Sequence, residues 1–375
     1  MKILICTPEY PPKASGIGIV AKSVVDEFIK KGHECVICSP TGPDIKLGNQ
    51  KYIKKFAGFG LIYFWEQVRR YFNKETNNYD AIWLHHPFFI FKNPFLKSLI
   101  TMHTTYAGFY MQSRCSNHHW WIRIYYYFMN LFERYSLTKC LDNNVKFTSI
   151  CDTVVKELKY YGIKNMIEII SNGTNTGTFI IQQDKNIIRT ELEIPDNRIV
   201  FIWVGRLIEE KRPDILLHLF LQFGDLSEKF YLIVVGDGKL REKLENLAEK
   251  YQLKNIRFFG AIEYSLMSKI IGCGDYYIMT SSYEGQPLTL LEAMSSGLPC
   301  IVSDIPNLDI IEDANCGIII DFSDIEKAAQ KIIKYVYQDN SKHAQNARKY
   351  SEENLNWELI AEKYLYELNN LKMND

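Results

Sequence analysis

The sequence contains no uninterrupted apolar run whose length approaches the roughly 20 residues that a membrane-spanning helix needs. Its first residues do not form a signal peptide, because the apolar stretch from Ile3 is short and no small-residue cleavage site follows it. The nine cysteines are odd in number and scattered, which is typical of reduced thiols. We therefore expect a cytoplasmic protein. Cys35 and Cys38 would point to opposite faces of a predicted strand, so a metal pair is not expected there.

Two motifs are also missing. No Asp-x-Asp occurs, so a divalent metal held by paired carboxylates is not indicated, and no Gly-x4-Gly-Lys-Ser/Thr occurs, which excludes P-loop hydrolysis of ATP. Cys115, His118 and His119 lie near one another but match no zinc spacing. We expect neither a metal nor a resident cofactor.

The formal net charge is zero, yet the two halves differ in sign. Residues 1–175 contain 22 Lys and Arg against 13 Asp and Glu, a charge of +9, and residues 176–375 contain 22 against 31, a charge of −9. A length of 375 residues, 47% of them hydrophobic, predicts a globular chain with two domains.

Strand-like runs alternate with helical stretches, which predicts parallel sheets covered by helices on both faces. In the first half the predicted strands are Ile3–Thr7, Glu34–Ser39, Ala81–His85, Leu99–His103, Phe147–Ile150 and Ile167–Ser171, with Lys51–Phe56 as a further short strand. In the second half they are Ile199–Val204, Tyr231–Val235, Ile256–Phe259, Tyr276–Thr280, Cys300–Ser303 and Gly317–Ile320. The predicted boundary lies between Asn172 and Asn197, and the segment Leu355–Leu371 has the spacing of an amphipathic helix.

A turn and a short helix follow the strand that ends at Thr280. Gly285 and Pro287 predict the turn, Leu288–Ser296 the helix, and Gly297 its end. The free N–H groups at the start of such a helix suit a phosphate.

Two carboxylates, Glu284 and Glu292, flank this helix entrance. They would repel an anion unless they accepted hydrogen bonds from hydroxyls, as a sugar nucleotide would provide. The alternative is a solvated Glu284 and a Glu292 stabilised by the helix dipole.

Two cations follow the strand that ends at Val204. Arg206 and Lys211 are placed to reach the crevice at the carboxyl edge of the sheet, where together they would stabilise a leaving diphosphate. The alternative is a solvated loop in which Glu209 and Glu210 neutralise both.

Gly16 and Gly18 have the spacing of a dinucleotide fingerprint, but they stand too far from the first strand, and no acidic residue ends the second strand at Ser39. This argues against NAD. A flexible glycine loop over a diphosphate fits better, and a plain surface loop is the alternative. His103 lies at a predicted strand end facing the crevice, as do His85 and His86 with a weaker claim.

The ordered set of motifs resembles the donor site of retaining glycosyltransferases of the GT-B fold, the large family-four group. The resemblance rests on Glu284-x7-Glu292 followed by Ala-Met-Ser-Ser-Gly-Leu-Pro. It extends over Gly16-Ile17-Gly18, Ser171-Asn172-Gly173, Gly205-Arg206-Leu207 with Lys211, and Gly236-Asp237-Gly238. One departure is Asn175, where the family usually has Asp.

The resemblance implies two Rossmann-like doubly wound domains facing across a cleft. Residues 1–174 plus 356–375 would form the acceptor-side domain with a returning C-terminal helix, and residues 175–355 the domain that binds the nucleotide sugar. It also implies transfer of a sugar from a UDP- or GDP-sugar to an acceptor hydroxyl, with retention and without metal. The acceptor would be a glycan or a lipid, and no nucleic-acid partner is expected.

The resemblance further implies a role for each motif residue. His103 would contact the transferred sugar, Glu284 would bind the donor sugar, and Glu292 would bind ribose hydroxyls. The implied catalytic residues are His103, Arg206, Lys211 and Glu284. The implied donor-binding residues are Gly16, Gly18, Gly205, Gly285, Gln286, Pro287, Leu288 and Glu292.

Two other interpretations remain at this stage. One is an epimerase or phosphorylase of the same fold, and the other is a non-catalytic module that binds sugar nucleotides or glycans. The basic, aromatic stretches of the first half predict either buried helices or peripheral contact with an anionic membrane. The second of these stretches runs from His118 through Trp120 and Trp121 to Arg134. For the first, the predicted membrane-contacting residues are Lys54, Lys55, Arg69 and Arg70, with Phe56 or Trp65 inserted.

Overall fold

A computed structural model describes residues 1–12, 16–56, 58–73, 78–95, 97–115, 119–141, 144–195 and 197–371. The chain divides into two compact units. The first comprises Met1–Asn172 with Trp357–Asp375, and the second comprises Gly173–Asn356. These bounds differ from the predicted ones by one or two residues.

The first unit is a parallel sheet with helices on both faces, as the alternation of strand and helix patterns predicts. Its strand order is β3-β2-β1-β4-β5-β6-β7, so the order reverses between β1 and β4. The strands are β1 (Lys2–Cys6), β2 (Glu34–Ser39), β3 (Ile45–Lys46), β4 (Ala81–His85), β5 (Ser98–Met102), β6 (Val145–Ser149) and β7 (Ile167–Ile169). The helices are α1 (Gly16–Lys30), α2 (Gln50–Phe56), α3 (Gly58–Phe72), α4 (Tyr106–Cys115), α5 (Trp120–Thr138), α6 (Asp152–Tyr160) and α15 (Trp357–Asn370).

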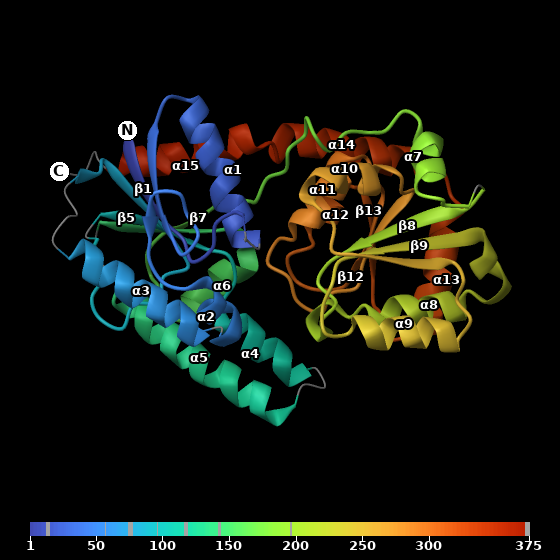
Figure 1. The fold of residues 1–375 in the computed structure, drawn as a ribbon, viewed down its shortest axis with the longest axis horizontal. Helices are drawn as coiled ribbons and strands as arrows, with labels where there is room; N and C mark the ends of the chain where they lie inside the picture. Colours follow the sequence, from blue (N-terminus) through green and yellow to red (C-terminus); the bar gives the residue numbers. More distant parts are fainter. Residues whose placement is uncertain are drawn as a thin grey trace. The chain divides into compact units, whose positions relative to one another are not determined.

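Helix α15 returns to the first unit from the far end of the sequence. It packs beside α1 and against β4 and β5, as Figure 1 shows for α15 (red) and α1 (blue). The ring of Tyr364 lies 4.5 Å from that of the buried Trp83 in β4. Lys31 also forms ion pairs with Glu358 and Glu362 at 3.3 and 2.8 Å. The last helix therefore belongs to the core of the first unit.

The second unit has the same architecture. Its sheet order is β10-β9-β8-β11-β12-β13, all parallel, and the order reverses between β8 and β11. The strands are β8 (Ile199–Val204), β9 (Phe230–Val235), β10 (Ile256–Gly260), β11 (Tyr276–Met279), β12 (Cys300–Ser303) and β13 (Gly317–Ile320). The helices are α7 (Lys185–Glu191), α8 (Asp214–Gln222), α9 (Arg241–Lys250), α10 (Tyr264–Gly272), α11 (Leu288–Ser295), α12 (Ile310–Asp313), α13 (Ile325–Val336) and α14 (Ser341–Asn354).

All twelve strands predicted without reservation are present, within two residues at each end. The extra strand predicted at Lys51–Phe56 is wrong, because this segment lies in helix α2. In the described part of the chain, β3 (Ile45–Lys46) is the strand that continues the sheet beyond β2. Helix α2 instead packs closely against helix α3. A Cβ placed on Gly60 would lie 2.4 Å from the Ile53 backbone, so the two helices approach more closely than any other residue would allow at position 60.

The glycine motif after β9 holds two loops against each other. Gly205 donates its N–H to Val235 at 3.0 Å, and Leu207 donates to Asp237 at 3.0 Å. A Cβ on Gly236 would lie 1.8 Å from the carbonyl oxygen of Gly205, and the backbone there has a φ of 127°. Gly236 is therefore required for packing, irrespective of any ligand.

We expect Gly236→Ala to lower the free energy of unfolding by at least about 3 kcal/mol, because it adds both a backbone clash and a strained φ. Gly224→Ala is the matched control. Its φ is 55°, but nothing lies within 4 Å of the new Cβ, so strain alone should cost about 1–2 kcal/mol. Urea denaturation measures both variants, and equal losses would contradict this account.

Candidate functional site

The carboxyl ends of β8 and β11 carry a partly buried ion pair. Lys211, in the short 3₁₀ turn Glu209–Lys211 after β8, donates to Oε1 of Glu284, which follows β11. The hydroxyl of Ser281 donates to the same oxygen at 2.6 Å. Because β8 and β11 flank the reversal in strand order, this pair stands where open α/β sheets bind their ligands.

Hydrogen bonds to the backbone fasten the two loops around this pair. The hydroxyl of Thr280 donates to the carbonyl of Lys211 at 2.9 Å, and Ser282 donates both its N–H and its hydroxyl to the carbonyl of Glu210. From the other side, Asn307 donates to the carbonyl of Glu284 at 2.8 Å. The positions of the ammonium and the carboxylate are thus fixed by the backbone on both sides.

Arg206 lies on the same loop as Lys211, two residues beyond the end of β8, and its side chain is exposed. Its backbone carbonyl accepts from the N–H of Ile208 at 2.9 Å, and its guanidinium has no hydrogen-bond or ion-pair partner among the described residues. The competing interpretation from sequence is that Glu209 and Glu210 neutralise both cations. Glu209 pairs with Lys239 at 2.6 Å, and Lys211 pairs with Glu284.

Helix α11 begins at Leu288 and carries Glu292 on its buried side. Gly285, Gln286 and Pro287 form the connection from Glu284, and Pro287 is the N-cap in extended conformation, so it precedes the first helical turn and is not part of it. Gly285 is buried, whereas Gln286, Pro287 and Leu288 are partly exposed.

Glu292 accepts a hydrogen bond from the hydroxyl of Tyr264, at the start of α10, at 2.7 Å. Burial raises the pKa of Glu292 to about 7, and the bond from Tyr264 acts in the opposite direction. Sequence reasoning did not identify Tyr264, which lies 28 positions from Glu292. The Glu292 carboxylate is therefore a buried acceptor that ionises near neutral pH.

His103 follows β5 in the first unit and is buried against a second histidine. Its Nε2 lies 3.0 Å from Nδ1 of His85, at the end of β4, and the two rings are stacked. Burial lowers the pKa of His103 to about 3, with a further contribution from His86, and burial also lowers the pKa of His85. Both imidazoles are neutral at physiological pH.

A fully buried carboxylate supports the segment that follows His103. Glu133, in α5, lies 2.9 Å from Nε2 of His86, and its other oxygen accepts from the N–H of Tyr106 and the hydroxyl of Tyr161, each at 2.6 Å. Sequence reasoning missed Glu133. The sequence does indicate its position, because Glu133 is four residues from both Met129 and Leu137 and so lies on the same buried face of α5.

The structure alters two sequence-based predictions about the first unit. Gly16 and Gly18 are the first and third residues of α1 and not part of a loop. Trp65 is fully buried in contact with the rings of Phe64 and Phe89, so it cannot insert into a membrane.

Two further membrane-contact predictions are affected. Arg69 is bound to Glu66 through two nitrogens, at 2.6 and 2.9 Å, and the exposed Arg70 also pairs with Glu66, at 3.1 Å. The side chains of Lys54, Lys55 and Phe56 lie outside the described part, as do His118 and the side chain of Cys115.

Within the described residues no group of three or more His, Cys, Asp and Glu could hold a metal, and no helix is long and apolar enough to cross a membrane.

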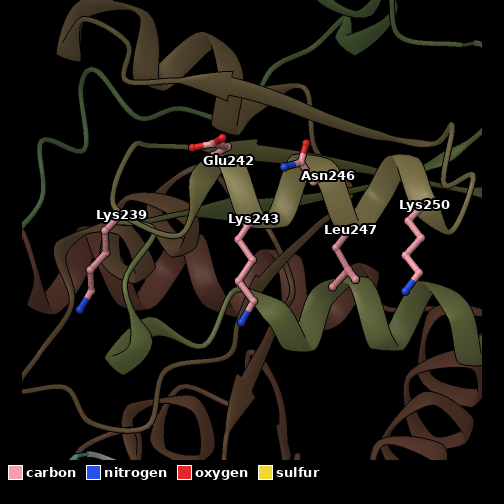
Figure 2. Close-up of a pocket in the computed structure, with 6 residues that line it drawn as sticks. All are labelled: Lys239, Glu242, Lys243, Asn246, Leu247 and Lys250. Atoms are coloured by element: carbon pink, nitrogen blue, oxygen red, sulfur yellow. The ribbon is translucent and has the colours of Figure 1, made fainter.

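The hollow in Figure 2 lies along α9 and includes none of the predicted site residues. The side chains of Lys243, Leu247 and Lys250 point to one side of the helix, and those of Glu242 and Asn246 point to the other. Surface lysines alone do not build a binding site, so no ligand is assigned to this hollow.

Fold and site together define a GT-B protein, with two doubly wound units and a charged pair at the sheet reversal of the second. The family model described as Glycosyltransferase Family 4 matches residues 14–178, and that of Glycosyl transferases group 1 matches residues 184–354. The chain therefore belongs to the GT-B glycosyltransferases of these two models.

Two curated relatives and one solved structure illustrate the similarity. The chain is 28% identical over 226 residues to the UDP-Gal:alpha-D-GlcNAc-diphosphoundecaprenol alpha-1,3-galactosyltransferase of Escherichia coli, covering 57% of this chain and 55% of that one. It is 25% identical to the alpha-monoglucosyldiacylglycerol synthase of Acholeplasma laidlawii, covering 85% and 84%. The chain spans about half the length of some curated relatives that it matches, 44% and 55% in two cases.

The structural similarity is more complete. The sucrose-phosphate synthase of Thermosynechococcus elongatus superposes with a TM-score of 0.80 at 19% identity, covering 99% of this chain and 98% of the other. At this level of identity the match establishes the fold alone.

Tyr264→Phe should raise the pKa of Glu292 above about 7, because it removes the hydrogen bond that favours the carboxylate. A titration of the carbon-13-labelled glutamate carboxyls by NMR measures this shift, with the exposed Tyr337→Phe as the control that should leave it unchanged. An unchanged or lower pKa in Tyr264→Phe would contradict the assignment.

Proposed function

We propose that the protein transfers the sugar of a UDP- or GDP-sugar to a hydroxyl of a lipid or lipid-linked glycan, with retention and without a resident metal. The observation that carries this proposal is the partly buried Lys211–Glu284 pair at the reversal between β8 and β11, with the exposed Arg206 on the same loop. This arrangement places cations that can bind a diphosphate beside a carboxylate that can accept hydrogen bonds from sugar hydroxyls.

Arg206 and Lys211 bind the leaving diphosphate in this proposal. An ammonium has three donors, so Lys211 can keep its bond to Glu284 and still donate to a phosphate oxygen. The guanidinium of Arg206 can donate two parallel hydrogen bonds to phosphate. Negative charge grows on the diphosphate as the glycosidic bond breaks, and both cations stabilise that charge most strongly in the transition state.

The carboxylates and His103 recognise hydroxyls. Glu284 accepts from the donor sugar and Glu292 from the ribose, and each remains anchored by Ser281 or Tyr264. His103 contacts the transferred sugar as a neutral imidazole, because burial holds its pKa near 3. It therefore contributes a hydrogen bond and no charge. Gly16 and Gly18, in the first turn of α1, leave room for phosphates near the helix start.

The nature of donor and acceptor is supported by the relatives and by the charge distribution. The galactosyltransferase of Escherichia coli is named for a UDP-sugar and a lipid diphosphate, and the synthase of Acholeplasma laidlawii for a glycolipid. The +9 charge of residues 1–175 suits an anionic acceptor or the membrane that carries it. We place the reaction at the cytoplasmic face of a membrane.

Arg206→Ala and Lys211→Ala should each lower turnover by about 10²-fold or more, the usual loss for one group that stabilises developing charge. Turnover is measured as nucleotide diphosphate released with acceptor present, after circular dichroism has confirmed the fold. The matched control is Lys243→Ala, which removes a cation on α9 away from the pair and should retain full activity. Wild-type turnover in folded Arg206→Ala and Lys211→Ala would refute these roles.

Activity should persist in excess EDTA, because the two cations replace the divalent metal that other sugar transferases place on the diphosphate. The comparison is the initial rate with EDTA, with Mg²⁺ and with Mn²⁺. A rate that vanishes in EDTA and returns only with a divalent ion would contradict the metal-free part of the proposal.

A further inference from the structure

Helix α5 is apolar on two opposite faces. Its inner face packs in the first unit through Met129, Glu133 and Leu137, all buried. A second set of apolar side chains is exposed, and we call it the α5 outer face: Trp120, Trp121, Ile124, Tyr127, Phe128, Leu131 and Tyr135. With 3.6 residues per turn these seven fall within an arc of about 120° and extend over about 22 Å of helix.

The exposure of this face is large. Trp120 is 72% exposed and Phe128 is 63% exposed. Exposed aromatics scattered singly need no explanation, but seven apolar side chains in one stripe mark an interaction surface. Helix α4 extends the stripe, because the ring of Tyr110 lies 5.5 Å from that of Tyr127 and Met111 is exposed nearby in sequence.

The charges around this face all have one sign. From His103 to Leu141 the sequence contains a single acidic residue, Glu133, and that residue is fully buried. Arg114, near the end of α4, and Arg134, beside the stripe on α5, are exposed. Lys139 lies over the ring of Tyr135, with its Nζ 4.7 Å from the centroid. On α4 and α5, aromatic rings and cations therefore lie together without an exposed carboxylate.

We propose that the α5 outer face binds the surface of an anionic lipid bilayer, with the helix parallel to the membrane plane. The apolar rings enter the boundary between headgroups and acyl chains, and Arg114, Arg134 and Lys139 contact anionic headgroups. Trp and Tyr suit this depth because each ring has an apolar body and a polar end. The biological purpose rests on the proposed lipid acceptor, but the binding itself does not.

The charge pattern favours a bilayer over a second copy of the chain. A symmetric dimer through this face would bring Arg114 and Arg134 of both copies together with no exposed carboxylate to pair with them. An anionic bilayer supplies the opposite charge over the whole length of the stripe. At the Lys54–Arg70 surface predicted from sequence, Trp65 is buried and Arg69 and Arg70 are both paired with Glu66.

The test is flotation of the full-length protein with vesicles. At low salt the wild type should float with vesicles of equal parts phosphatidylglycerol and phosphatidylcholine and should bind pure phosphatidylcholine at least about tenfold more weakly, since cations and anionic lipids attract. Added salt should weaken binding to the anionic vesicles. Absence of binding to them at low salt would overturn the proposal.

Variants separate the two components of binding. Trp121→Glu combined with Phe128→Glu should reduce anionic-vesicle binding by about tenfold or more, because two rings no longer enter the lipid. Arg134→Glu should reduce both the binding and its salt dependence. The matched control is Tyr160→Glu combined with Tyr366→Glu, two exposed rings of the same unit outside the stripe, which should bind almost as the wild type does. Equal losses in control and test variants would overturn the proposal.

Three further measurements keep the outcomes distinct. A thermal shift with UDP as the probe should be the same for wild type and all variants, which establishes that the fold and second unit are intact. Sedimentation of the wild type should show a monomer, and a dimer dissolved by Trp121→Glu with Phe128→Glu would assign the face to self-association instead. Transfer to a short-chain soluble acceptor should be unaffected by these variants. A protein that floats but transfers no sugar would refute the proposed function while leaving the docking surface in place.

Discussion

The second unit depends on one contact, the ion pair between Lys211 and Glu284. It joins the loops after β8 and β11, which are the two strands where the sheet reverses its order. A carboxylate as buried as Glu284 is costly without a cation, and a buried pair is lost with a large penalty when one partner is removed. The cation that pairs with Glu284 here also stands at the carboxyl edge of the sheet. The same contact thus constrains the fold and defines the site.

In each unit the candidate site residues lie at the carboxyl edge of that unit's own sheet, but their chemistry differs. In the second unit this edge carries the Lys211–Glu284 ion pair and the carboxyl group of Glu292, whose pKa is raised to about 7 by burial. In the first unit it carries His85 and His103, stacked and kept neutral by burial. Charge stabilisation is therefore a property of the second unit, and the first offers hydrogen bonds. In the proposed reaction the departing diphosphate gains negative charge and the sugar becomes oxocarbenium-like, so cations suit the diphosphate and uncharged hydrogen-bonding groups suit the sugar.

The sequence predicts the strands well because parallel strands buried on both faces are almost continuously apolar, as in Ile199–Val204. It fails at Lys51–Phe56, where the apolar residues are too few to distinguish strand from helix and the tight approach of α2 to α3 decides. It locates Glu284 and Glu292 through their motif. It misses Glu133 and Tyr264, because their partners lie 47 and 28 positions away and only the fold brings them together.

Composition alone also could not locate the exposed aromatics. Trp65 and Trp121 lie in stretches of similar aromatic and basic content, yet Trp65 is in the core with Phe89 and Trp121 is exposed. The charges separate in the same way, because Arg69 is neutralised by Glu66 whereas the cations around α5 have no exposed acidic neighbour on α4 or α5. A net charge of +9 over half a chain thus says little about where an anion binds. What matters is which cations remain unneutralised beside exposed apolar surface, and in the described part of the first unit that combination is most extensive along α5.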